Sequence, residues 1–183
     1  MERNIHLTNS AKVYRVALTG ILGAQALALW WLESLLPAFP FLPPGFKPGL
    51  SNIVIMFSVS QLGIPSSVFL VLLKAGFALI TRGATAALTG LLGGILSLGM
   101  MILLLRPKKQ VFGLVGVGVL SALMHNLGQL LAAMLITSTF SLVSYAPMLL
   151  LFGILTGSVT GCIFRAVMPL LNKQSKFFVS PHP

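Results

Sequence analysis

Long apolar runs follow one another along almost the whole chain, and only short polar or proline-rich stretches separate them. The hydrocarbon core of a bilayer is about 30 Å thick, and a helix of about 20 apolar residues crosses it. Such a helix also satisfies its backbone hydrogen bonds internally, which lipid cannot do. Since 56% of the residues are hydrophobic and only 8% are charged, we expect an all-α integral membrane protein.

The apolar runs predict a single membrane domain over residues 1–183, built as a compact bundle of about six transmembrane helices. The predicted spans are residues 13–36, 50–62, 66–81, 84–105, 111–137 and 144–168. The second and third runs are short, and the second is also compatible with a re-entrant segment. We expect a proline-rich outer loop at 37–49 and a cytoplasmic tail at 169–183. Because the other connections are short, neighbouring helices should be antiparallel.

Basic residues indicate how the bundle is oriented, because short cytoplasmic loops are enriched in Lys and Arg. With six spans, three basic groups fall on one side: Arg3, Lys12 and Arg15; Arg106, Lys108 and Lys109; and Arg165, Lys173 and Lys176. This pattern predicts a multi-pass protein of a bacterial cell membrane with both termini cytoplasmic. The formal charge of +10 is then mostly a topology signal. No basic stripe interleaved with aromatic residues indicates nucleic-acid binding.

The stretch SALMHNLGQLL, residues 121–131, places three hydrogen-bonding side chains inside an apolar run. At 1.5 Å per residue, His125, Asn126 and Gln129 lie about 20 to 27 Å along the fifth span, in the outer half of the membrane. His125 and Gln129 are four residues apart and share one helical face. Asn52 on the second span and Lys74 on the third are expected at a similar depth.

Ionisable groups at this depth are costly in lipid, by about 2.5 to 3.5 kcal/mol for a central lysine. They should therefore face the bundle interior, and we expect them to line a cavity that is open to the outside. The candidate substrate-binding residues are Lys47, Asn52, Lys74, Arg82, His125, Asn126, Gln129 and Trp30. The cations outnumber the one nearby acid, Glu33, which favours an anionic ligand such as a carboxylate or phosphate. Aromatic residues near the same surface would cover an apolar ring or chain.

Several of these residues also have a purely structural interpretation. Trp30 and Trp31 fit an aromatic belt at the membrane interface. Asn126 and Gln129 are of the type that hydrogen-bonds helices together. Lys74 and Glu33 would form a structural ion pair if they meet. The sequence leaves these alternatives open.

Small residues recur every four positions in the first and last spans. One stripe is Gly20, Ala24 and Ala28, and the other is Gly153, Gly157 and Gly161. Small residues at this spacing let another helix approach closely, so internal packing and docking of a separate membrane subunit are both open. The stretch TGLLGGILSLG in the fourth span is expected to serve close packing, since it lacks the Lys of a phosphate-binding loop.

The residue types that the chain lacks or has in small number exclude several kinds of catalytic and metal-binding chemistry. The chain has no aspartate, and its only acids are Glu2 and Glu33. Paired-carboxylate catalysis and an Asp-rich magnesium site for a diphosphate are therefore excluded. One cysteine and three scattered histidines form no plausible zinc set. We expect no enzymatic activity, no cofactor and no metal, and any active transport would need a partner or an ion gradient.

Five blocks of the sequence carry a resemblance to a known family: ALTGILGAQALALWWLESLLP, FLPPGFKPGLSNIVIMF, VFLVLLKAGFALITRG, GGILSLGMMILLL and SALMHNLGQLLAA. From about Val16 to Met168, the chain resembles the membrane family labelled Gx transporter or heptaprenyl diphosphate synthase component I. That family is itself similar to the S components of energy-coupling factor (ECF) transporters, which are small helical bundles.

The similarity to S components implies a substrate-binding subunit of an importer for a scarce anionic nutrient, such as a vitamin. The implied partners are a membrane T component and two cytoplasmic ATPases. The positions that match the T-component contact are Gly20, Ala24 and Ala28, and those that match the loop over the ligand are Pro43, Pro44, Gly45 and Lys47.

The synthase label implies a different role, because this chain cannot build a prenyl synthase active site without aspartates. The label is then best explained by association with isoprenoid or quinone metabolism, and the substrate would be a naphthoate-like quinone precursor or a prenyl-linked anion. The alternatives to an importer subunit are a non-catalytic membrane subunit of heptaprenyl diphosphate synthase and a secondary carrier that uses Glu33.

Overall fold

Helices make up all the regular secondary structure that the computed structural model describes, which covers residues 2–35, 49–105 and 112–179, with side chains in 12–35, 49–105 and 112–169. The elements are α1 (Glu2–Leu35), α2 (Asn52–Gln61), α3 (Ile64–Arg82), α4 (Ala84–Leu105), α5 (Leu114–Thr137), the 3-10 helix η1 (Phe140–Tyr145) and α6 (Ala146–Val179). The predicted all-α class is confirmed for these residues, and the predicted outer loop lies mostly outside them.

Five helices are long and apolar enough to cross a membrane. These segments are Lys12–Leu35, Ile64–Arg82, Ala84–Leu105, Leu114–Thr137 and Phe140–Pro169. The predicted second span corresponds to α2, which has only 10 residues and is therefore about 15 Å long, half of a bilayer core. The number of crossings and the orientation in the membrane stay predictions.

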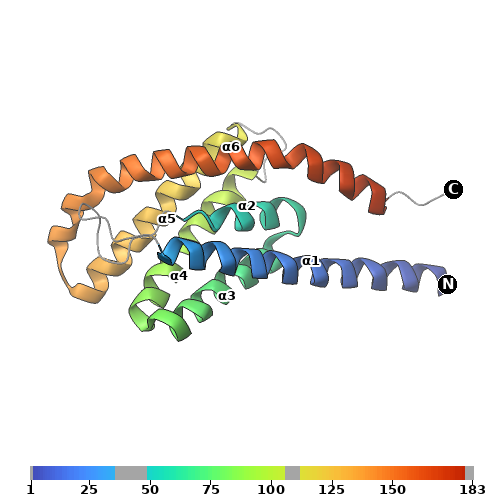
Figure 1. Cartoon of the computed structure of the whole chain (residues 1–183), viewed down its shortest axis with the longest axis horizontal. Coiled ribbons are helices and arrows are strands. Elements are labelled where there is room, and N and C mark those ends of the chain that lie inside the picture. Colours follow the sequence, from blue (N-terminus) through green and yellow to red (C-terminus); the bar gives the residue numbers. More distant parts are fainter. Residues whose placement is uncertain (1, 36–48, 106–111, 180–183) are drawn as a thin grey trace.

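Helices α1 and α6 are longer than the predicted spans and extend past the other helices on the same side (Figure 1). The polar residues before Lys12 and much of the predicted tail at 169–183 continue these helices, the latter as far as Val179. Polar residues end the apolar run that predicts a membrane span, but here the helices continue through them. Both chain termini therefore lie at the same end of the bundle, which we call the terminal end.

Glycines in the left-handed region of the backbone allow two very short reversals. Gly63 separates α2 from α3 with φ of 91°, and Gly83 separates α3 from α4 with φ of 85°. Side chains are rarely tolerated at such angles, whereas glycine adopts them readily. These reversals make α2, α3 and α4 successively antiparallel, as the short connections predict.

Glycines also bring α4, α5 and α6 into close contact. A Cβ atom added to Gly118 of α5 would lie 2.5 Å from the carbonyl oxygen of Gly157 in α6. A Cβ atom added to Gly128 of α5 would lie 2.7 Å from Cα of Gly93 in α4. The glycine-rich stretch of the fourth span and the stripe of the last span thus serve internal packing, as one of the two interpretations of each predicts.

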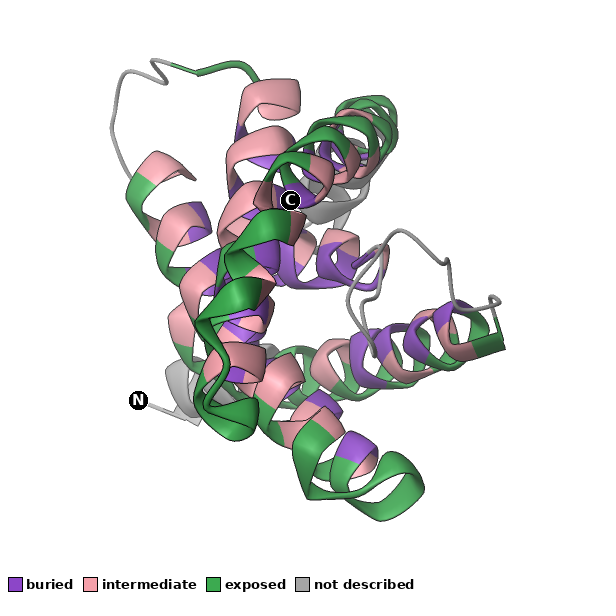
Figure 2. Cartoon of the chain, turned by 90° about the vertical axis from the view of Figure 1, so that its left-hand side faces the viewer, coloured by how far each residue is buried: buried purple, intermediate pink, exposed green. Residues whose placement is uncertain are grey.

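Buried residues face the middle of the bundle and exposed residues face outward (Figure 2). The exposed residues are mostly large and apolar, such as Ile80 and Leu135, which suits a surface in contact with lipid. Several buried residues in the interior are polar or charged. Its buried hydroxyl groups belong to Ser51, Ser58, Ser67, Ser97, Ser121 and Thr160.

Candidate functional site

A pocket between α1, α3, α4 and α5 collects most of the polar residues that the sequence singles out. Its lining residues include Trp30, Glu33, Ser51, Lys74, Arg82, Thr89, His125 and Gln129. We call this site the polar pocket. It brings together five of the eight candidate residues, from helices far apart in the sequence. Whether they bind a ligand stays a prediction.

Two charged residues hold the start of α2 at the polar pocket. The carboxylate Oε1 of Glu33 in α1 accepts a hydrogen bond of 2.6 Å from the backbone N–H of Ser51. Nζ of Lys74 in α3 donates to Oδ1 of Asn52 at 3.1 Å. All four residues are buried. A negative charge beside the first residues of a helix is stabilised by the helix dipole.

Glu33 and Lys74 line the same pocket and attract each other electrostatically. The hydrogen bond that the structure gives to Lys74 nevertheless goes to Asn52. Lys74 therefore does more than neutralise Glu33, because it also ties α3 to α2. Asn52 itself borders a separate small cavity rather than the polar pocket.

His125 and Gln129 form the α5 side of the polar pocket. The amide of Gln129 and Nε2 of His125 are hydrogen-bonded at 2.9 Å, which confirms that the two side chains share one helical face. The ring of His125 lies against Gly93 of α4 and Gly49 before α2, where an added Cβ would be 3.0 Å and 3.2 Å from ring atoms. The glycines thus make room for the imidazole.

Asn126 does not face the polar pocket. Its Nδ2 donates to the carbonyl oxygen of Leu149 in α6 at 2.9 Å. Since it lies one residue from His125 on a helix, its side chain points about 100° away. The helix-bonding interpretation of Asn126 is therefore the one that the geometry supports.

Trp30 lines the polar pocket and is buried, with its ring 5.5 Å from that of Phe77 in an edge-to-face arrangement. The interfacial-belt interpretation fits its neighbour Trp31 better, because that side chain is 53% exposed. Successive residues of a helix face different directions, so Trp30 lies in the interior of the bundle and Trp31 lies at its surface.

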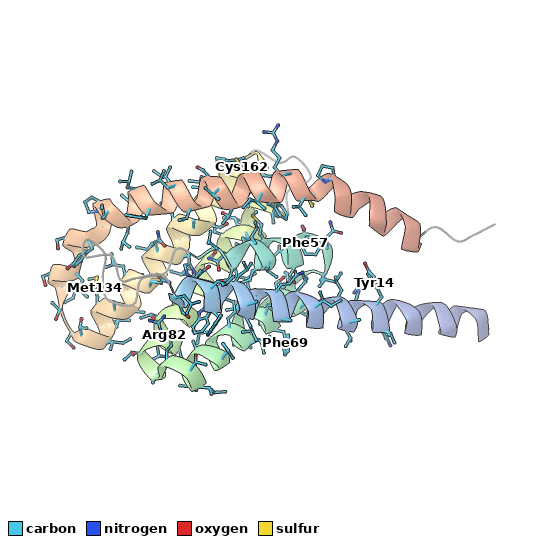
Figure 3. The ribbon with its side chains drawn as sticks, viewed as in Figure 1. Tyr14, Phe57, Phe69, Arg82, Met134 and Cys162 are labelled. Atoms are coloured by element: carbon cyan, nitrogen blue, oxygen red, sulfur yellow. The ribbon has the colours of Figure 1, made fainter. Side chains whose placement is uncertain are left out.

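Arg82 lines the polar pocket and lies where α3 meets α4 (Figure 3). Its side chain is exposed, and so it can attract an anion from solvent without the cost of burial. The remaining candidate cation, Lys47, and the loop residues Pro43, Pro44 and Gly45 lie outside the described residues.

The polar pocket is small in this conformation. Its open volume is about 30 Å³, and one water needs about 10 to 15 Å³ measured in this way. The pocket can therefore hold two or three waters, whereas sites for drug-sized ligands measure about 300 to 1,000 Å³. The expected naphthoate-like ligand does not fit unless groups that line the pocket move.

A larger groove lies at the terminal end, beside the reversal between α2 and α3. It encloses about 490 Å³ and is lined mainly by apolar side chains, including Ile64, Ile102, Leu105, Leu114 and Met168. We call it the apolar groove. Its lining comes from five different helices and has no periodic pattern in any one of them, so the groove was not predictable from the sequence.

The two stripes of small residues differ in their surroundings. Gly20, Ala24 and Ala28 on α1 are exposed, and a Cβ added to Gly20 would meet nothing within 4 Å. Gly153, Gly157 and Gly161 on α6 are instead covered by α5. The α1 stripe is thus free for contact with lipid or with another membrane protein.

Ser51 is a pocket residue that sequence reasoning missed. It is 1% exposed, and its Oγ has no hydrogen-bond partner among the described residues. A serine beside a proline-rich loop looks like an ordinary turn residue. Its position in GLSN, directly before an apolar run, is where a capping serine is expected, and this is the signal that could have identified it. Among the described residues, no group of three or more His, Cys, Asp and Glu side chains could hold a metal ion.

Comparison with known proteins gives one finding. A family model described as heptaprenyl diphosphate synthase component I matches residues 22–167. No curated protein and no solved structure matches the chain. The match covers α2 to α5 completely, together with most of the membrane-spanning parts of α1 and α6.

Proposed function

Because the chain belongs to the heptaprenyl diphosphate synthase component I family, we propose that it is a non-catalytic membrane subunit that works with a prenyl diphosphate synthase. The family match over residues 22–167 is the observation that carries this proposal. The partner would be a separate, Asp-rich protein that performs the chemistry.

The absence of aspartate supports the non-catalytic role. Magnesium is bound through carboxylates together with substrate phosphates, and this chain has only Glu2 and Glu33 as side-chain carboxylates. Glu33 already accepts a hydrogen bond from Ser51. The catalytic carboxylates of the reaction would therefore belong to the partner.

Two features support contact with an isoprenoid ligand. The apolar groove has the size of a ligand site, about 490 Å³, and its hydrocarbon lining matches a prenyl chain. The polar pocket carries Lys74 and Arg82, which match an anionic group. The two sites lie in different parts of the bundle, so they serve different ligands or different molecules of one ligand class.

The test is a gentle affinity purification of the tagged chain from its native membrane, with mass spectrometry of proteins and extracted small molecules. We expect to recover a soluble prenyl diphosphate synthase in amounts comparable with those of the tagged chain. An unrelated multi-pass protein with the same tag is the control. Recovery of no synthase under conditions that keep the bundle folded would contradict the proposal.

A second candidate, a substrate-binding subunit of an ECF-type importer, is favoured by the exposed α1 stripe. In that case the same purification would recover a T-type membrane subunit and ATPases. Replacement of Gly20 and Ala24 by Leu should then remove those partners without changing the thermal stability. The same change at Gln25, which is exposed on a different face of α1, is the matched control.

A further inference from the structure

We propose that the carboxylate of Glu33 occupies an oxyanion subsite of the polar pocket, and that an external phosphate or diphosphate group binds there by displacing it. The proposal rests on the proposed function, because a partner of a prenyl diphosphate synthase meets such groups. In this proposal the carboxylate of Glu33 fills the anion site of the free protein, and a ligand must displace it to bind.

The donors of this subsite come from α2 and α3. The backbone N–H of Ser51 donates to Glu33 at 2.6 Å. The next three N–H groups, of residues 52–54, are already bonded to the backbone carbonyls of residues 49–51. Ser51 therefore offers the one N–H of this turn that binds a side-chain anion, and the α2 dipole favours negative charge there.

An unused donor in the same place indicates that the subsite is larger than one carboxylate. The hydroxyl of Ser51 lines the polar pocket, is buried and has no partner among the described residues. A buried hydroxyl without a partner is costly. Lys74 has three N–H donors and uses one of them on Asn52. Ser51 and Lys74 together can thus serve an anion with more oxygens than Glu33 supplies.

The size of the pocket makes displacement necessary. An open volume of about 30 Å³ admits a few waters but not a phosphate group beside a carboxylate. Two anions at this depth would also repel each other strongly, because the surroundings screen charge poorly. When the carboxylate of Glu33 leaves, it removes both the steric and the electrostatic obstacle.

Inorganic diphosphate is the probe for this proposal, and its binding to the purified full chain in detergent is measured by isothermal titration calorimetry. Glu33→Gln preserves the shape and an acceptor for the Ser51 N–H, but it removes the charge. We expect Glu33→Gln to bind diphosphate at least about tenfold more tightly than the wild-type chain, a difference of about 1.4 kcal/mol. Lys74→Met in the Glu33→Gln background should abolish this binding.

The control is Arg165→Gln, which removes a charge from the exposed surface of α6 and should leave diphosphate binding unchanged. Equal or weaker binding by Glu33→Gln would overturn the proposal, as would no binding by either protein. Neither result would affect the association with a synthase, which the affinity purification measures separately. The two proposals therefore fail in different experiments.

A second measurement uses the wild-type protein and so does not depend on the folding of a variant. Glu2 and Glu33 are the only side-chain carboxylates in the sequence, so infrared difference spectroscopy can follow Glu33 in the wild-type protein. Addition of diphosphate should shift a carboxylate band, because Glu33 exchanges the Ser51 N–H for other partners. Saturation with diphosphate without any shift of a carboxylate band would overturn the displacement.

Discussion

His125 and Asn126 are adjacent in the sequence, yet their side chains serve different parts of the molecule. His125 lines the polar pocket and bonds to Gln129. Asn126 bonds to the backbone of α6. Substitution of each should therefore change a different measurement.

We expect Asn126→Ala to lower the thermal stability and to leave diphosphate binding unchanged. The lost interhelical hydrogen bond corresponds to about 0.6 kcal/mol, and at most about 1.7 kcal/mol. His125→Ala should weaken diphosphate binding, because it removes from the pocket lining a ring nitrogen that can donate a hydrogen bond to an anion. Thermal unfolding in detergent and calorimetry give the two values. Weaker binding by Asn126→Ala would contradict the assignment of its side chain to α6.

At the residue scale, sequence reasoning located the polar cluster but not the direction of each side chain. Depth along a helix follows from counting residues, and this placed Lys74 and His125 in one region, where the structure has both lining one pocket. The choice between pocket and neighbouring helix depends on how each helix is rotated. That rotation is set by close contacts such as those of Gly118 with α6, which a single sequence does not specify.

Helices α5 and α6 pack closely because glycines at their interface carry no side chains. Gly157 of α6 packs so closely that an added Cβ would lie 2.5 Å from Cα of Val119 and 2.8 Å from the carbonyl oxygen of Gly118. These are backbone atoms, which cannot rotate away. Gly99 on α4 is exposed and has nothing within 4 Å of an added Cβ.

We therefore expect Gly157→Ala to destabilise the protein by about 1 to 3 kcal/mol, the usual cost of overpacking. Gly99→Ala is the matched control and should be neutral or stabilising by about 0.5 to 1 kcal/mol, because alanine favours helix more than glycine does. Unfolding curves in detergent provide the comparison. Equal stability of the two variants would mean that α5 and α6 are not in close contact.

Helix positions were predictable because hydrocarbon thickness sets their length and glycine sets their ends. The predicted span 84–105 coincides with α4, and 111–137 differs from α5 only at its start. The predicted second span, 50–62, corresponds to α2, which has only 10 residues, and whether it crosses the membrane stays a prediction. An apolar sequence is expected both for a helix in lipid and for a helix buried in protein. Half of the residues of α2 are buried in protein.

At the scale of the whole molecule, the two termini share one end of the bundle (Figure 1). The basic residues predict that this end is cytoplasmic. The reversal after α5 would then face outward, and the part of α1 before Val13 would face the cytoplasm.

Single cysteines test this orientation in a Cys162→Ser background, since Cys162 is the only cysteine in the sequence. Thr139→Cys, in the exposed turn after α5, should react with a membrane-impermeant maleimide added to intact cells. Lys12→Cys on α1 should react only after the membrane is opened. The reverse pattern would show that the bundle is inserted the other way round.

The family and the architecture were accessible from the sequence, whereas the partner and the ligand were not. Apolar run length and the blocks around GLSN and HNLGQ are local features. A partner recognises a surface, and the exposed stripe of Gly20, Ala24 and Ala28 would accept a helix from more than one kind of membrane protein. The small volume of the polar pocket likewise depends on Glu33 and Ser51, which come from segments 18 residues apart.

The short length of α2 has a consequence for biosynthesis. A ten-residue helix released alone into lipid would leave its flanking peptide groups without hydrogen-bond partners. Only Leu62 and Gly63 separate it from α3, so α2 and α3 should leave the translocon together as one hairpin. Since Ser51 directly precedes α2, its hydrogen bond with Glu33 of α1 should form only after this hairpin has entered the membrane.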